Sequence, residues 1–170
     1  MCRIILIILF CSFLIVFAQQ ENEQSKMIYQ NFVLENLDGE YIELKEEIGS
    51  GPVLISFWAT WCKPCKEELK EYNKLFEKYS DSGLKIFAIS IDNEKSIAKV
   101  KPFVRTNNFQ FTVLLDTNSD AARMYYAQMV PYSLILNKTG EIIYTHLGYK
   151  KGDELEVERI ISDLVSKQDL

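Results

Sequence analysis

The residues VLISFWATWCKPCKEE, numbered 53–68, combine three kinds of local sequence that together decide the fold. Val53–Ala59 is almost entirely apolar, which is typical of a strand covered on both faces in a largely parallel sheet. Lys66–Tyr79 places apolar side chains three and four residues apart, which predicts an amphipathic helix. The turn between them holds Cys62 and Cys65 in a Cys-x-x-Cys arrangement. The sequence therefore predicts two thiols at a strand-to-helix junction of an α/β domain.

The position of the first thiol indicates redox chemistry. Unpaired backbone N–H groups and the positive end of the helix dipole favour a thiolate at a helix N-terminus, so Cys62 is the predicted nucleophile. Cys65, one turn later, is close enough to close a small disulfide ring and to release a captured partner. We expect this redox-active disulfide to be sufficient without a further cofactor. A purely structural disulfide is the alternative, although so small a loop constrains the unfolded chain little.

The stretch from Val53 to Glu68 closely resembles the TlpA/ResA-like thiol-disulfide oxidoreductases of the thioredoxin superfamily, and a looser resemblance extends from Phe32 to Val165. It implies a thioredoxin-like fold with a mixed central sheet and a central helix-strand insertion. Asp-Gly at residues 38–39, between two short alternating segments, predicts an N-terminal β-hairpin in front of the redox strand.

The remaining elements are predicted from apolar periodicity and from turn residues. After the redox helix we expect a strand, a helix, a short strand, a short helix, a hairpin and a final amphipathic helix. Their expected positions are Leu84–Ile91, Glu94–Arg105, Phe111–Leu115, Ser119–Ala127, residues 132–147 and residues 157–164. By resemblance, the helix and strand at 94–105 and 111–115 form the insertion.

The resemblance also implies a substrate-binding surface. In thioredoxin-like proteins a cis proline lies against the Cys-x-x-Cys, and Pro131 matches it in position. The Val130 backbone could then pair with an extended substrate segment. Within the turn itself, Trp61, Lys63 and Pro64 are the other predicted substrate-binding residues. A plain proline at a strand edge is the alternative for Pro131.

Glu68 is the predicted proton acceptor for the resolving thiol. It matches a glutamate that the family carries near its cysteines, and it lies three residues beyond Cys65 on about the same helix face. Ser56 occupies the position where thioredoxin has an acidic residue, and a serine cannot serve as that base. An ordinary solvated helix glutamate is the alternative interpretation of Glu68.

The composition fits one globular domain, since 170 residues with 48% hydrophobic content suffice for a substantial core. Residues 1–18 contain Arg3, an apolar run and Ala18 at the end, the pattern of a secretion signal. The run is short for a membrane span. We therefore expect cleavage, a linker at 19–30, a domain at 31–170, and an exported, periplasmic or otherwise extracytoplasmic protein. A retained, membrane-anchoring segment is the alternative.

The expected partners follow from charge and resemblance. A net charge of −5 without a basic stripe argues against nucleic acid. The resemblance implies protein disulfide substrates, with apocytochrome c cysteine pairs in cytochrome c maturation as one candidate, an upstream membrane thiol donor and a monomeric protein. No metal site is predicted, because two cysteines and one histidine remain after processing.

Two other functions share the fold. Sco-like copper-binding chaperones carry a Cys-x-x-x-Cys pattern, which is one residue longer than the Cys-x-x-Cys spacing here. Peroxiredoxin-type thiol peroxidases carry a proline and a threonine at fixed distances before the reactive cysteine, and that pattern is absent before Cys62 and Cys65.

Overall fold

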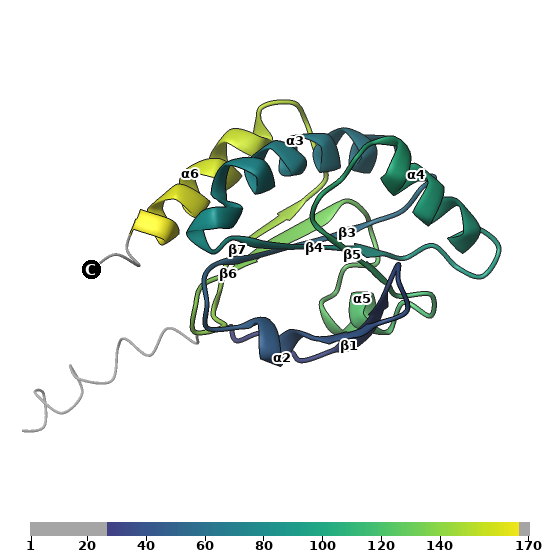
Figure 1. Ribbon diagram of the computed structural model, residues 1–170, viewed down its shortest axis with the longest axis horizontal. Helices are drawn as coiled ribbons and strands as arrows, with labels where there is room; N and C mark the ends of the chain where they lie inside the picture. The colour runs from purple at the N-terminus through teal and green to yellow at the C-terminus, as the bar shows by residue number, and fades with distance from the viewer. Residues whose placement is uncertain (1–26, 167–170) are drawn as a thin grey trace, which may run out of the picture.

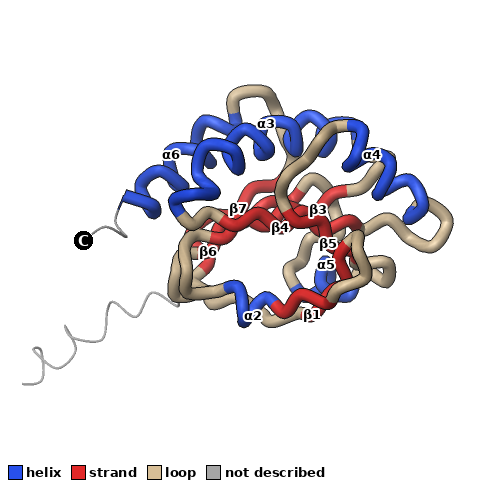
Figure 2. The backbone as a smooth tube through the Cα atoms, in the orientation of Figure 1, coloured by secondary structure: helices blue, strands red, loops and turns tan. Residues whose placement is uncertain are grey.

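The computed structural model describes residues 27–166, so the predicted signal segment lies outside the described residues. Within the described range a seven-stranded sheet carries helices on both faces (Figures 1 and 2). The strands are β1 (Val33–Asn36), β2 (Tyr41–Glu43), β3 (Val53–Trp58), β4 (Lys85–Ser90), β5 (Thr112–Leu115), β6 (Tyr132–Leu136) and β7 (Ile142–Leu147). The helices are α2 (Leu44–Glu47), α3 (Lys63–Tyr79), α4 (Val100–Thr106), α5 (Asp120–Met124) and α6 (Asp153–Ser166).

The strand order β2-β1-β5-β4-β3-β6-β7 places β3 between β4 and β6. β3 is parallel to β4 and antiparallel to β6, and β4 is parallel to β5. The β1–β2 hairpin extends the sheet because β1 pairs antiparallel with β5. The predicted thioredoxin-like α/β fold with a mixed sheet and an N-terminal hairpin is confirmed, and α4 and β5 occupy the place of the predicted insertion.

The apolar core is divided between the two faces of the sheet. Leu54 and Trp58 of β3 belong to the cluster under α3, α4 and α6, whereas Ile55 and Phe57 belong to the cluster that includes α2 and α5. Figure 1 shows α3 and α6 side by side over one face, and α2 and α5 at the other. Because both faces of β3 are covered, its sequence is a continuous apolar run.

The redox helix begins earlier than its apolar periodicity predicts. α3 begins at Lys63 rather than Lys66, and Cys62 is the residue that caps it. Pro64 lies in the first turn, where a missing N–H removes no helical hydrogen bond. Both cysteines are therefore part of the helix start.

Two other predicted helices are shorter than expected. α4 begins at Val100 rather than at residue 94, after a 3-10 turn at Ile97–Lys99, and this start places Pro102 in its first turn. α5 ends at Met124 rather than at residue 127, because Tyr126 has a φ of 57°, which no α-helix accommodates.

Part of the predicted linker contacts the domain. The Tyr29 N–H donates to the Gly140 carbonyl at 2.9 Å, and the Ile142 N–H donates to the Met27 carbonyl at 2.8 Å. Residues 27–30 thus lie along the turn between β6 and β7, although the sequence assigns them to a polar linker. Over residues 27–166, no helix is long and apolar enough to cross a membrane.

Candidate active site

Cys62 and Cys65 form a disulfide at the start of α3, with their Cα atoms 5.4 Å apart. The Cys62 sulfur also accepts a hydrogen bond from the Cys65 backbone N–H at 3.2 Å. Cys62 is 5% exposed and Cys65 is fully buried, so the first sulfur is the one nearer to solvent. After reduction, the same N–H and the helix dipole would stabilise a thiolate on Cys62.

The two tryptophans on either side of the turn have different surroundings. Trp58, the last residue of β3, is buried, and its ring centroid lies 5.4 Å from that of Phe103 in α4. Its Nε1 has no hydrogen-bond partner within the described part of the chain. Trp61 is 64% exposed beside Cys62, and Lys63 and Pro64 are also exposed. Three of the predicted substrate-binding residues are thus accessible around the disulfide.

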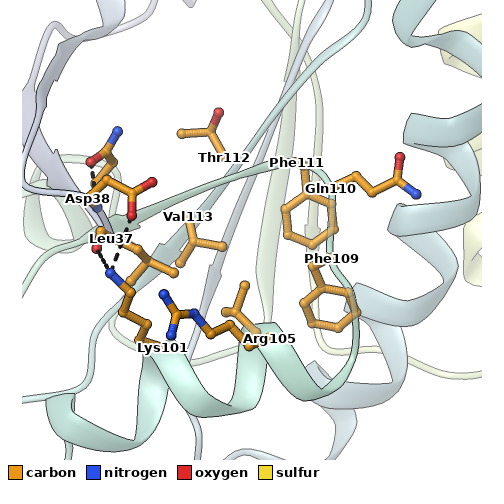
Figure 3. A pocket seen from close by; sticks show the side chains of 11 residues that line it. Leu37, Asp38, Lys101, Arg105, Phe109, Gln110, Phe111, Thr112 and Val113 are labelled. Carbon is orange, nitrogen blue, oxygen red and sulfur yellow. Dashed lines mark hydrogen bonds and ion pairs between the residues drawn. The ribbon is translucent and has the colours of Figure 1, made fainter.

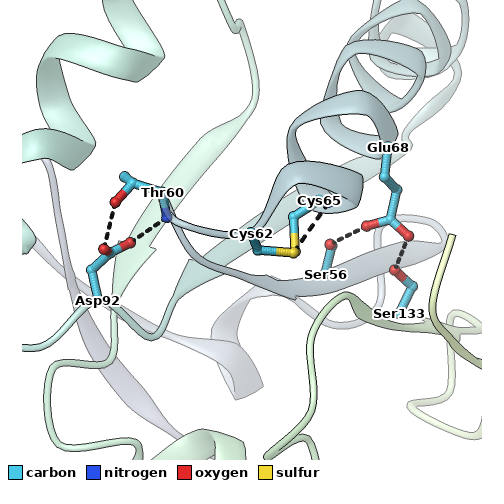
Figure 4. Close-up of a disulfide and its surroundings, with 7 residues drawn as sticks. All are labelled: Ser56, Thr60, Cys62, Cys65, Glu68, Asp92 and Ser133. Carbon is cyan, nitrogen blue, oxygen red and sulfur yellow. Dashed lines mark hydrogen bonds between the residues drawn. A yellow bond between two sulfur atoms is a disulfide. The ribbon is translucent and has the colours of Figure 1, made fainter.

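Glu68 is buried, which overturns its interpretation as a solvated helix residue. Three hydroxyl groups donate to its carboxylate: Ser56 at 2.8 Å, Ser133 at 3.1 Å and Tyr72 at 3.2 Å. Figure 4 shows Glu68 reaching from α3 toward both serines, one helical turn beyond Cys65. The carboxylate is therefore held by groups from α3, β3 and β6 together.

The register of the sheet explains this arrangement. Ser56 in β3 and Ser133 in β6 are directly opposed partners, so their side chains point to the same face, the face that α3 covers. Each interrupts an otherwise apolar strand, and that interruption is the sequence signal that could have revealed a buried polar partner. Sequence reasoning dismissed Ser56 as a base and passed over Ser133, because their common partner lies on another element.

The surroundings of Glu68 strongly affect its protonation. Burial raises the pKa of Glu68 from its ordinary value of 4.5 to about 7, although the hydrogen bonds from Ser56, Ser133 and Tyr72 act in the opposite direction. Burial likewise raises the pKa of Tyr72, which therefore stays a hydrogen-bond donor. A carboxyl with a pKa near neutrality can both take up and release a proton under physiological conditions.

A second buried carboxylate holds the segment in front of the disulfide. Asp92 accepts the Thr60 backbone N–H at 2.7 Å and the Thr60 hydroxyl at 2.6 Å (Figure 4). Sequence reasoning did not identify either residue. Thr60 lies two residues before Cys62, and the Cys62 N–H donates to the Ala59 carbonyl at 3.0 Å. The turn is therefore fixed on both sides of Thr60.

Val130 and Pro131 are at the same end of the sheet as the disulfide. Tyr132, which follows them, pairs with Phe57 near the end of β3, and Val130 packs against the apolar cluster that contains Cys62. The Val130–Pro131 peptide bond is cis, as the family resemblance implies. The Pro131 carbonyl accepts a hydrogen bond from Gly148 at 2.8 Å.

Other polar features lie apart from the two cysteines. A pocket of about 400 Å³ lies between the β1–β2 turn, α4 and β5, and its lining includes Lys101, Arg105 and Phe109 but neither cysteine (Figure 3). His146, the only histidine of the chain, places Nε2 3.1 Å from an Asp153 carboxylate oxygen. Between residues 27 and 166, no group of three or more His, Cys, Asp or Glu side chains could hold a metal ion.

The site combines three chemical features: a sulfur at a helix N-terminus, a second sulfur buried behind it, and a buried carboxyl that titrates near neutrality. The Cys62 sulfur can attack a disulfide, and the Cys65 sulfur can then displace the captured partner. The Glu68 carboxyl can accept the proton that the Cys65 thiol loses.

Comparison with known proteins agrees with this chemistry. Residues 27–145 match the AhpC/TSA family. Thiol-disulfide oxidoreductase ResA from Bacillus cereus is 36% identical over 140 residues, which cover 82% of this chain and 79% of the relative.

Solved structures are similar as well. The Chlorobium tepidum protein assigned as thiol:disulfide interchange protein DsbE superposes with a TM-score of 0.76 and 25% identity, over 82% of this chain and 96% of that one. StoA from Bacillus subtilis superposes with a TM-score of 0.64 and 25% identity, over 76% and 96% of the two chains. This chain therefore belongs to the AhpC/TSA family and is a ResA-like thiol-disulfide oxidoreductase with the disulfide Cys62–Cys65.

Proposed function

We propose that the protein reduces disulfides of other proteins outside the cytoplasm, with Cys62 as nucleophile, Cys65 as resolving thiol and Glu68 as proton acceptor. The observation that carries this proposal is the buried Glu68 carboxyl, whose pKa is raised to about 7 by burial, one helical turn from the resolving cysteine. A buried thiol needs a nearby base before it can attack, and the buried carboxyl three residues further along the helix supports this role for Glu68.

The first step forms a mixed disulfide. The reduced protein attacks with the Cys62 thiolate, whose sulfur forms a bond to one sulfur of the substrate disulfide while the substrate S–S bond breaks. The departing substrate thiolate takes a proton from solvent. Cys62 is slightly more exposed than Cys65, 5% against 0%, which supports its role as the attacking residue.

The second step releases the substrate. The Cys65 thiol transfers its proton to the Glu68 carboxylate, and the resulting thiolate attacks the Cys62 sulfur. The bond between Cys62 and the substrate breaks, and the second substrate thiolate leaves and is protonated. Two electrons have then passed from the cysteine pair to the substrate, and the pair is a disulfide as in this structure.

The substrate is an extended protein segment that carries a disulfide. The backbone of Val130 would pair with this segment as an added strand, and Pro131, Trp61, Lys63 and Pro64 would border it. Cysteine pairs of apocytochrome c are the substrate that we propose, on the basis of the family resemblance carried by residues 53–68.

The cellular setting is part of the same proposal. An exported protein that acts as a reductant must be reduced again, so we propose a membrane protein as the upstream thiol donor. Residues 1–18 would direct export, either as a cleaved signal or as a membrane anchor. The protein would act as a monomer.

Trapping of the mixed disulfide tests the order of the two cysteines. Reduced Cys65→Ser protein should accumulate a covalent adduct with a disulfide-containing peptide, because its Cys62 still attacks but no thiol resolves the product. Cys62→Ser should form no comparable adduct. Mass spectrometry of the intact proteins measures both, and an adduct that forms only with Cys62→Ser would reverse the assignment.

A redox titration tests the direction. Equilibration of the wild-type pair with dithiothreitol should give a potential closer to that of thioredoxin, about −270 mV, than to that of the oxidant DsbA, about −120 mV. A potential near the second value would contradict a reducing role.

A further inference from the structure

Asp92 is a buried acidic residue that the proposed exchange steps do not use. It follows β4 and is fully buried, at the edge of the sheet from which the redox turn starts. Besides the two hydrogen bonds from Thr60, its carboxylate accepts the Ser90 hydroxyl at 2.9 Å. Thr60 lies two residues beyond the end of β3, and Ser90 is the last residue of β4, which pairs with β3 up to Trp58 and Ser90.

The carboxylate is ionised and has no cationic partner. Burial by itself would raise the pKa of Asp92, but hydrogen bonds, among them those from Thr60 and Ser90, outweigh it and hold the pKa below the ordinary value of 3.8. Among the residues that the structure describes, no Lys, Arg or His side chain forms an ion pair with Asp92. Asp92 therefore carries a negative charge that is balanced by neutral donors alone.

This charge is attached directly to the redox turn. Thr60, which Asp92 holds by both its backbone and its side chain, is two residues before Cys62 (Figure 4). Because the Asp92 side chain is shielded from direct contact with solvent, its charge is screened less than that of an exposed carboxylate. A negative charge held against Thr60, two residues before Cys62, has the sign that disfavours a thiolate at Cys62.

We propose that Asp92 tunes the redox equilibrium of the cysteine pair by destabilising the Cys62 thiolate, which makes the reduced protein a stronger reductant. The disulfide takes up two electrons and two protons to become a dithiol, or one proton fewer when Cys62 is a thiolate. Asp92 gains and loses nothing in this reaction. It acts through its electric field on the charge of the product, and the bonds from Thr60 hold its carboxylate beside the turn.

Other charged groups act on Cys62 in different directions. On α3, the helix N-terminus and the exposed Lys63 and the half-buried Lys66 favour the thiolate, whereas a carboxylate at Glu68 disfavours it. From α4, the uncharged ring of Phe103 faces this region, and the Lys66 Nζ lies 5.9 Å from the centroid of this ring. Asp92 is thus the buried anion on the strand side, where no cation offsets it among the described residues.

Asp92→Asn tests the proposal because asparagine keeps the shape and removes the charge. Equilibration of the purified full-length protein with dithiothreitol at pH 9 should shift by about threefold to tenfold toward the reduced pair. The pH profile of Cys62 alkylation by iodoacetamide should move to lower pH by about half a unit to one unit. If Asp92→Asn fails to fold, Asp92→Ser takes its place with the same expected shifts.

Thr60→Val is the matched control. It removes the hydroxyl bond to Asp92 but keeps the charge and the backbone bond, so it should change the equilibrium much less than Asp92→Asn. Equal shifts in the two variants, or a shift of Asp92→Asn toward the disulfide, would overturn the proposal.

This proposal rests on thiol-disulfide exchange by Cys62 and Cys65. Its test compares the redox equilibrium of Asp92→Asn with that of the wild type and does not depend on the absolute potential. An oxidising wild-type potential would contradict the proposed reducing role and leave this difference unaffected. The two failures are therefore distinguishable.

Discussion

Glu68 is the residue whose protonation most directly links the site to the stability of the fold. Its pKa is raised by burial to about 7, from 4.5 in an unfolded chain. Between these values the folded protein holds a proton that the unfolded chain has released, so the contribution is present below pH 4.5 and is lost as the pH rises through 7. The loss amounts to at most about 3 kcal/mol of the free energy of unfolding.

Glu68→Gln should remove this part of the pH dependence, because a neutral amide replaces the titrating carboxyl. We expect the free energy of unfolding of the oxidised wild type to fall more steeply between about pH 4.5 and about pH 7 than that of the variant. Urea unfolding at several pH values measures it. Glu67→Gln, at the exposed neighbouring position, is the control and should follow the wild type. Parallel pH curves for all three proteins would contradict the raised pKa.

Glu68→Gln should also slow the second step of exchange more than the first. The variant retains Cys62 and its helix N-terminus, so the mixed disulfide should still form, but Cys65 has lost its proton acceptor. Stopped-flow detection of adduct formation and decay separates the two steps. If both rates match those of the wild type, the resolving thiol has another base.

At the scale of elements, the parallel pair β3–β4 is started by a close contact between two glycines. A Cβ added at Gly51 would lie 2.2 Å from the carbonyl oxygen of Gly83, a backbone atom that cannot rotate away. The Lys85 N–H donates to the Pro52 carbonyl at 3.0 Å immediately beyond this contact. The two strands can therefore pair from their first residues only because Gly51 has no side chain.

Gly51→Ala should cost about 1–3 kcal/mol of the free energy of unfolding, since the two strands must move apart. The redox potential should stay the same, because Cys62 follows the opposite end of β3. Chemical unfolding and a dithiothreitol titration check the two parts. The exposed neighbour provides the control Ser50→Ala, which should leave stability nearly unchanged. A stable Gly51→Ala protein would show that the strand starts can separate at little cost.

At the scale of the whole molecule, one face of the sheet holds the redox site and the other face holds the N-terminal segment. The Glu68 network lies under α3, whereas Tyr125 belongs to the apolar cluster of the other face. The Tyr125 hydroxyl accepts the Gln30 N–H at 3.0 Å and donates to the Gln30 carbonyl at 2.5 Å. This side chain fastens the segment that leads into the domain.

Tyr125→Phe should loosen the N-terminal segment without changing exchange. The loss of two hydrogen bonds should cost about 1–2 kcal/mol and increase amide hydrogen exchange at residues 27–31. Tyr126→Phe, at an exposed position next to it, should have neither effect. Hydrogen-exchange mass spectrometry with an activity assay compares the variants. Unaltered protection at residues 27–31 in Tyr125→Phe would mean that the backbone hydrogen bonds of Met27 and Tyr29 hold the segment by themselves.

Much of this architecture follows from local patterns that need no tertiary contact. The apolar run of β3 requires cover on both faces, and the Asp-Gly pair at residues 38–39 specifies a tight hairpin. The helix boundaries were less accurate at residues 94–100 and 124–127, because Pro102 and the backbone of Tyr126 set them more strongly than apolar spacing does.

The sequence by itself determined the two sulfurs, their order along a helix start and the sheet beneath them, because spacing and capping are properties of neighbouring residues. Only the tertiary structure decided that Glu68 is buried against Ser56 and Ser133, and that Asp92 accepts hydrogen bonds from Thr60. The protonation of a carboxyl depends on solvent access and on donors from distant strands. Those appear only when the strands pair in register and the helix packs over them.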